Sequence, residues 1–129
     1  MAKRYRMYIL VLVFAVLIGG IPVIAIQNNT PTIKTFEVHE YQNYLSNFSS
    51  EEKLGAISDI QDLLKKVEMI WIKNYGEHIK KEKPYQIFYD ENNEIWLVQG
   101  TLRPNMMGGV ANIIVEDGTG KVLAIWHDK

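Results

Sequence analysis

Hydrophobic positions follow a helical period in the first part of the chain and a strand period after about residue 83. Between 36 and 48, apolar side chains recur every three or four residues, at Val38, Tyr41, Leu45 and Phe48. This spacing predicts a short helix over 36–48, with Thr35 as a candidate N-cap.

A second, longer helix is predicted between 51 and 75. Ser49 and Glu52 match a capping box before it, and Gly76 suits a left-handed cap after it. The pattern leaves its start open, because Gly55 and Ser58–Asp59 can break a helix there. The apolar stripe consists of Ile57, Ile60, Leu64, Val67, Trp71 and Tyr75.

The later part of the chain predicts four strands, over 85–89, 94–101, 110–116 and 121–127. Turn-forming residues separate the first two at 90–93 and the last two at 117–120, where Gly118 and Gly120 are expected at positive φ. Short connections imply an antiparallel meander. The predicted fold is therefore α+β, with one or two helices packed on a four-stranded antiparallel sheet and Trp71 in the core.

The N-terminal segment has a different character. Residues 7–26 carry no charge, and Lys3, Arg4 and Arg6 precede them. Twenty helical residues span about 30 Å, the thickness of a bilayer core. We therefore predict that 1–26 is a membrane anchor, or alternatively a signal segment cleaved near Ala25. The charge distribution places the following domain outside the cytoplasm, either as a single-pass membrane protein or, after cleavage, secreted or periplasmic. Residues 27–35 form the predicted linker, and 36–129 the domain.

Composition narrows the class of function. The chain of 129 residues has no cysteine, which excludes disulfides, thiolate metal sites and a cysteine nucleophile. Its formal net charge of −1 gives no reason to expect a nucleic-acid partner. His39, His78 and His127 are scattered without metal-ligand spacing, so they are expected to be solvated or edge histidines, and no metal or cofactor is predicted.

The segment 65–83 combines six lysines with three glutamates, a net charge of +3. Two interpretations stay open. One is a solvated helix face, and the other is a patch for an acidic partner or anionic lipid headgroups.

Five residues are candidates for contact with a protein partner. Trp96 and Trp126 would form an exposed aromatic patch if both lay on the outer face of the sheet. Arg103, Met106 and Met107 belong to the loop 103–109, which is either a recognition loop or a bend that begins the third strand.

Three stretches occur in an order typical of a known family. They are Trp71–Glu77 continuing to Glu82–Tyr85, then Trp96–Leu102, then Gly108–Ala111 continuing through Asp117–Gly118 to Gly120–Leu123. Together they resemble the YbbC/YhhH family of immunity proteins, which have the nuclear-transport-factor-2-like (cystatin-like) fold. The resemblance implies a cone-like α+β domain that binds and neutralises a cognate bacterial toxin. It supplies no catalytic residues.

Three functions are therefore considered. The first is a non-catalytic immunity protein, which the family resemblance favours. The second is a sensory or inhibitor domain of the cell envelope, of PepSY-like or cystatin-like type. The third is a small enzyme with acid–base chemistry in a pocket, which is disfavoured because the strand interiors are apolar and Glu94 and Glu116 lie at strand ends.

Overall fold

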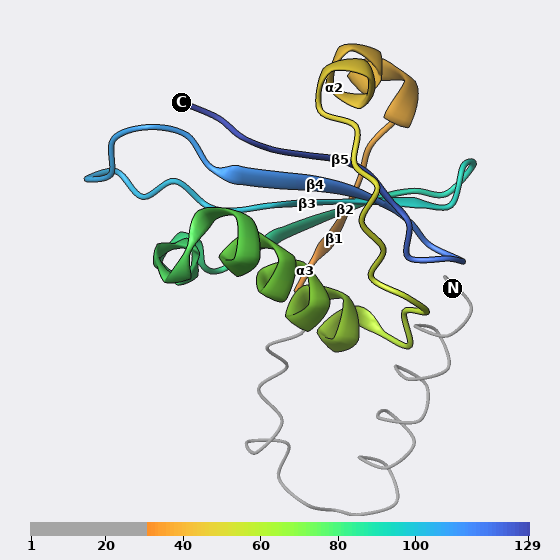
Figure 1. Ribbon diagram of the computed structural model, residues 1–129, viewed down its shortest axis with the longest axis horizontal. Coiled ribbons are helices and arrows are strands. Elements are labelled where there is room, and N and C mark those ends of the chain that lie inside the picture. Colours follow the sequence, from red (N-terminus) through yellow and green to blue (C-terminus); the bar gives the residue numbers. More distant parts are fainter. Residues whose placement is uncertain (1–30) are drawn as a thin grey trace, which may run out of the picture. The chain divides into compact units, whose positions relative to one another are not determined.

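The computed structural model describes residues 31–129, in which helices lie on both faces of one sheet (Figure 1). The helical elements are the 3-10 helix η2 (Val38–Tyr41), the helices α2 (Gln42–Asn47) and α3 (Ile60–Tyr75), and the 3-10 helix η3 (Glu77–Glu82). The strands are β1 (Ile33–Thr35), β2 (Gln86–Asp90), β3 (Ile95–Gln99), β4 (Ala111–Glu116) and β5 (Val122–His127). The α+β prediction is thus confirmed.

The sheet has five strands in the order β1-β2-β3-β4-β5. Strands β2 to β5 form the predicted antiparallel meander, whereas β1 pairs with β2 in parallel, with Ile33 opposite Ile87. The predicted sheet of four antiparallel strands was therefore incomplete, and part of the predicted linker is its edge strand. A three-residue strand is too short to show a period, so its pairing with β2 defines it.

Helix α3 covers one face of the sheet, below it in Figure 1. The helix begins after Asp59, whose side chain accepts a hydrogen bond from the Asp62 N–H at 2.8 Å. The predicted capping box was wrong, because residues 51–59 are not helical and Ser50 Oγ accepts from the Glu52 N–H instead. The predicted Gly76 cap is confirmed at positive φ, +96°.

The core on the α3 side contains most of the predicted stripe. The buried helix residues are Ile60, Leu63, Val67 and Trp71, so Leu63 takes the fully buried place that was predicted for Leu64. Trp71 is completely buried. Its ring meets Tyr85 edge to face at 5.1 Å, and its Nε1–H donates to the Asn112 carbonyl oxygen at 3.4 Å. The prediction that Trp71 joins the helix to the sheet is confirmed.

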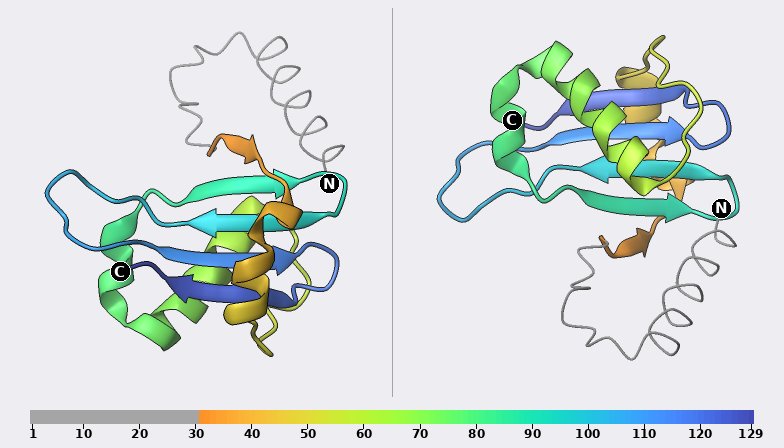
Figure 2. Two further views of the ribbon diagram at one scale, coloured as in Figure 1. Left: turned by 90° about the horizontal axis from the view of Figure 1, so that it is seen from above. Right: turned by 90° about the horizontal axis from the view of Figure 1, so that it is seen from below.

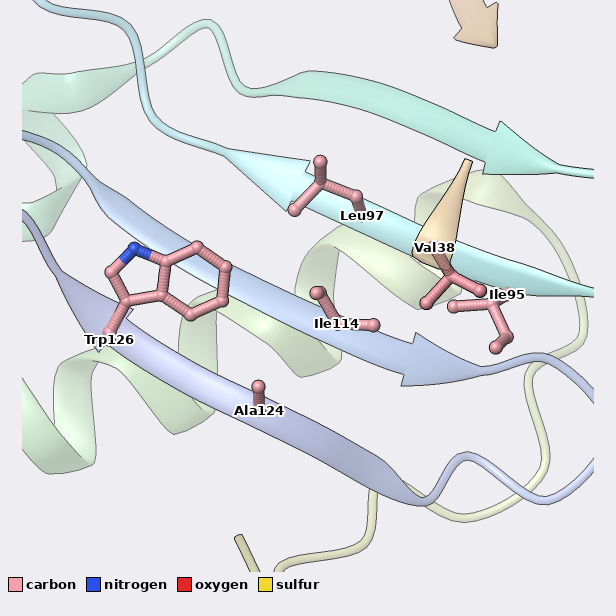
Figure 3. Close-up of a cluster of buried hydrophobic side chains, with 6 residues drawn as sticks. All are labelled: Val38, Ile95, Leu97, Ile114, Ala124 and Trp126. Atoms are coloured by element: carbon pink, nitrogen blue, oxygen red, sulfur yellow. The ribbon is translucent and has the colours of Figure 1, made fainter. Parts of the chain in front are cut away.

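The opposite face is covered by η2 and α2, as the view from above shows (Figure 2). The buried cluster there consists of Val38, Ile95, Leu97, Ile114, Ala124 and Trp126 (Figure 3). The predicted helix over 36–48 is confirmed as η2 followed by α2. The candidate cap was wrong, because Thr35 lies in β1 and Glu37 precedes the first turn.

The outer edge of β5 is covered by the segment 48–55. The Ile125 N–H donates to the Phe48 carbonyl oxygen and the Val122 N–H donates to the Glu52 carbonyl oxygen, both at 3.0 Å. The Leu54 N–H donates to the Gly120 carbonyl oxygen at 2.7 Å. Gly120 has positive φ as predicted, +71°, whereas Gly118 does not. These hydrogen bonds satisfy amides at the edge of β5 that could otherwise pair with a strand of another chain.

Among residues 31–129, no helix is long and apolar enough to span a bilayer. The predicted anchor or signal segment, 1–26, lies outside the described residues.

Candidate partner-binding surface

The loop between β3 and β4 extends beyond the end of the sheet (Figure 2). Met107 is 99% exposed and Leu102 is 46% exposed, although both are large apolar side chains. Arg103 is exposed too, and its Nη2–H donates to the Lys83 carbonyl oxygen at 3.4 Å. Met106 is partly buried, and its N–H closes a turn onto the Arg103 carbonyl oxygen at 2.9 Å. Leu102 and Met107 thus give the loop exposed apolar side chains outside the core.

Glu82 holds both ends of this loop. Its backbone carbonyl oxygen accepts from the Thr101 N–H at 2.7 Å, and its Oε1 accepts from the Ala111 N–H at 2.7 Å. Glu82 is 2% exposed. Gly100 lies so close to the Glu82 side chain that a Cβ atom at that position would overlap with it. One buried acid in η3 thus fixes where the loop leaves and rejoins the sheet.

The other carboxylate oxygen of Glu82 reaches β5. Glu82 Oε2 lies 3.0 Å from His127 Nε2, and His127 Nδ1 lies 2.7 Å from the Asp128 carbonyl oxygen. Each ring nitrogen thus faces an oxygen atom. His127 lies on the edge strand β5 with 28% of its side chain exposed, in agreement with the expectation of a solvated or edge histidine, and its ring also meets Tyr75 edge to face at 5.4 Å. Sequence reasoning missed Glu82, which stands among lysines and gave no sign of burial.

The predicted patch of Trp96 and Trp126 does not exist. Side chains that are paired across neighbouring strands share a face. Trp96 is opposite Val115 on the α3 face, whereas Trp126 is opposite Asn112 on the α2 face. Both tryptophans are buried, and Trp96 Nε1–H donates to Asp117 Oδ1 at 2.9 Å. Trp96 is therefore a core residue, because its register turns it toward α3.

Trp126 instead forms the base of an aromatic stack that does reach the surface. The ring centre of Tyr44 lies 4.5 Å from that of Trp126, with an angle of 27° between the ring planes. The ring centre of Phe48 lies 6.0 Å from that of Trp126, with an angle of 25°. Tyr44 is 39% exposed and Phe48 is 42% exposed. Tyr41 is partly buried beside them, 5.7 Å from Tyr44. We call Tyr41, Tyr44, Phe48 and Trp126 the aromatic surface. The predicted helical period included Tyr41 and Phe48 but not Tyr44.

A row of polar side chains crosses the α2 face between the aromatic surface and the loop. The register places Gln86, Gln99, Asn112 and Trp126 next to one another across four strands. Gln99 Nε2–H donates to Asn112 Oδ1 at 2.8 Å, and Asn112 Nδ2–H donates to Asp128 Oδ2 at 3.2 Å. Asp128 Oδ1 accepts from Trp126 Nε1–H at 3.1 Å. The loop and the aromatic surface thus flank one row of the sheet.

The lysine-rich segment 65–83 is largely paired with acids. Lys66, Lys73, Lys80 and Lys83 form ion pairs with Asp62, Glu52, Glu77 and Glu68 respectively, at 2.6–3.0 Å. Burial would raise the pKa of Glu68, but hydrogen bonds from Tyr85 and Lys83 outweigh it and lower that pKa. The pairing favours the interpretation of a solvated face with internal ion pairs over a patch for an acidic partner.

Acidic groups gather on η2 as well. Among the described residues, Glu37, His39 and Glu40 have their ligand-type atoms within 4.8 Å of one another, and all three are exposed. Glu37 pairs with His39 at 3.3 Å. These groups belong to the helical turn that precedes Tyr41 and α2.

Comparison with known proteins identifies the family. The family model described as NTF2 fold immunity protein matches residues 65–129, which is just over half of the chain and runs from α3 to the C-terminus. No curated protein and no solved structure matches the chain. The match includes the loop, Glu82 and the meander, whereas η2 and α2 lie before it. This protein therefore belongs to the family of NTF2-fold immunity proteins.

Proposed function

We propose that this protein neutralises a cognate bacterial toxin by binding it without catalysis, and that the loop Leu102–Gly109 is part of the contact. The observation that carries the proposal is Met107, an apolar side chain that is almost fully exposed at a loop with both ends held by Glu82. Membership of an immunity-protein family supplies the class of partner.

The loop has the properties of a preorganised contact. Its ends are fixed by hydrogen bonds, so less conformational entropy is lost when a partner binds. Leu102 and Met107 offer apolar area, and arginine is over-represented among residues that dominate binding energy. Because the exposed side chains of this loop add nothing to the core, they can be changed without unfolding the domain.

The proposal is tested by finding the genes next to this one and co-expressing the chain with any toxin domain that they encode. Arg103→Ala and Met107→Ala should each weaken protection while leaving the thermal midpoint unchanged. Met69→Ala is the matched control, because Met69 is a methionine that is 62% exposed on α3 and is not part of the loop. Equal protection by all four proteins would remove the loop from the contact.

Stoichiometry separates binding from catalysis. Purified toxin titrated with the full-length chain should lose activity up to about one chain per toxin and then no further. Complete inactivation at a small fraction of one equivalent would show catalytic destruction of the toxin. Absence of binding to the neighbouring toxin would favour the alternative, a sensory or inhibitor domain of the envelope.

We further propose that residues 7–26 tether the domain to the membrane from outside the cytoplasm, or direct its export before cleavage near Ala25. The supporting observation is the uncharged run behind Lys3, Arg4 and Arg6. A reporter enzyme that folds only outside the cytoplasm, fused after Lys129, should be active. Activity of a cytoplasmic reporter alone would overturn the proposal.

A further inference from the structure

We propose that the aromatic surface of η2 and α2 binds arginine or lysine side chains of the toxin. This inference rests on the proposed function and adds the chemistry of the partner. It concerns a different surface from the loop, one that was not predicted from the sequence, and it commits to a cationic protein surface as the occupant.

The first observation is the geometry of the rings. Tyr44, Phe48 and Trp126 lie nearly parallel, and Tyr44 and Phe48 keep about two fifths of their surface exposed. Trp126 is held in place by its hydrogen bond to Asp128 and supports the other two from below. A fixed, partly exposed ring face attracts cations through its quadrupole, with guanidinium groups preferred.

The second observation is the charge around these rings. Residues 36–52 contain four glutamates and no lysine or arginine. Glu52 Oε1 already forms an ion pair with Lys73 Nζ at 2.6 Å, so Glu52 is not counted as a contact for a cationic partner. Glu37, His39 and Glu40 have ligand-type atoms within 4.8 Å of one another, so a guanidinium that contacts both carboxylates would share Glu37 with His39, which pairs with it at 3.3 Å. Burial raises the pKa of Tyr41, and the charge of the neighbouring Glu40 raises it further.

The lysine that precedes η2 is engaged on β2. Lys34 Nζ donates to Gln86 Oε1 at 3.2 Å and lies 5.5 Å from the centre of the Phe88 ring. The surface therefore combines exposed ring faces with the carboxylates of Glu37 and Glu40, which suits a partner with positive charge and disfavours an acidic one.

The experiment uses the full-length chain labelled with ¹⁵N and a hexa-arginine peptide as the probe, with hexaglutamate as the matched peptide. The chain has three indole N–H groups, from Trp71, Trp96 and Trp126. Hexa-arginine should shift the Trp126 indole signal and the amides of η2 and α2, while the signals of Trp71 and Trp96 stay unchanged. Shifts confined to other elements, or equal shifts with hexaglutamate, would overturn the inference.

Variants then connect the surface to the toxin. The double variant Glu37→Gln and Glu40→Gln removes charge, and Tyr44→Ala with Phe48→Ala removes the exposed rings. Each should weaken toxin binding about tenfold. The charge variant should also lose most of the dependence of binding on salt concentration. Glu91→Gln is the matched control, because Glu91 is exposed in the turn after β2.

The outcomes separate the two proposals. If the wild-type chain binds the toxin and both double variants bind equally well at low and high salt, this inference is overturned and the proposed function stands. If the wild-type chain binds hexa-arginine at the Trp126 surface but not the neighbouring toxin, the proposed function is overturned instead. A dimer of this chain, seen as concentration-dependent mass with the same Trp126 shift, would replace the toxin by a second copy and overturn the inference.

Discussion

Glu82 Oε2 and His127 Nε2 lie 3.0 Å apart beneath the exposed loop, and through this pair η3 is joined to β5. The second oxygen of Glu82 and its backbone carbonyl hold Ala111 and Thr101 at the two ends of the loop. A buried carboxylate is costly unless its acceptors are satisfied, and here both oxygens have partners. The pair thus makes the position of the loop a property of the folded core.

We predict that Glu82→Ala destabilises the protein by about 1–3 kcal/mol, because the Ala111 N–H is left buried without an acceptor. Glu82→Gln should cost less, since its side-chain oxygen can still accept from Ala111. Urea denaturation measures both. Hydrogen exchange should show faster exchange of the Thr101 and Ala111 amides in the alanine variant. If the two variants have the same stability and exchange as the wild type, Glu82 does not hold the loop.

We predict that Trp71→Ala costs about 3–5 kcal/mol, because a fully buried ring between α3 and the sheet is removed. In a domain of ordinary stability this loss is enough to unfold much of the protein. Met69→Ala, at an exposed position of the same helix, should change the free energy of unfolding little. Thermal denaturation followed by circular dichroism provides the measurement, and similar midpoints for the two variants would contradict the packing described.

We predict that Gly120→Ala is destabilising by at least about 1–2 kcal/mol, since Gly120 has a φ of +71°. An added Cβ atom would also overlap with the Gly55 carbonyl oxygen, where the segment 48–55 crosses the turn. Gly118→Ala is the matched control, because its Cβ atom would meet open space and its φ is not positive. A smaller loss for Gly120→Ala than for Gly118→Ala would argue against the close approach of the two segments.

We predict that the Asp90 carboxylate stabilises the protein at neutral pH and that this contribution is lost in acid. Burial would raise the pKa of Asp90, but hydrogen bonds from Val38 N–H and Asn93 outweigh it and hold that pKa below its usual 3.8. A lowered pKa in the folded state contributes stability at pH values above about 4. This contribution is lost as the pH falls through the lowered pKa. Asp90→Asn should therefore be less stable than the wild type at pH 7, and the difference should shrink toward pH 2. A constant difference in urea midpoint across this range would show that the Asp90 charge does not contribute.

Much of the fold could be predicted because it is encoded in neighbouring residues. The four strands of the meander, the stripe with Trp71 and the Gly76 cap are all visible as a period or as a turn-forming residue. The start of α3 was harder to predict, because Ser49 matches a cap whereas Gly55 and Ser58–Asp59 can break the helix after it. The structure uses Asp59, since residues 48–55 are needed along the edge of β5.

The candidate surface was predicted only in part. The loop with Arg103, Met106 and Met107 was recognised, because loops carry exposed side chains whatever the details of packing. The sheet faces on which Trp96 and Trp126 lie were not predicted, since a change of one residue in register moves a side chain to the other face of a sheet. Nothing in their local sequence distinguishes the two faces.

The helices and strands from α2 onward, the burial of Trp71 and the likeness to immunity proteins could largely be inferred from the chain, since these depend on spacing and order along it. Three features could not: Ile33–Thr35 join the sheet, Glu82 is buried under the loop, and Tyr44 and Phe48 stack on Trp126. Each of these results from contact between segments that are distant in the sequence, and such contacts leave no local period.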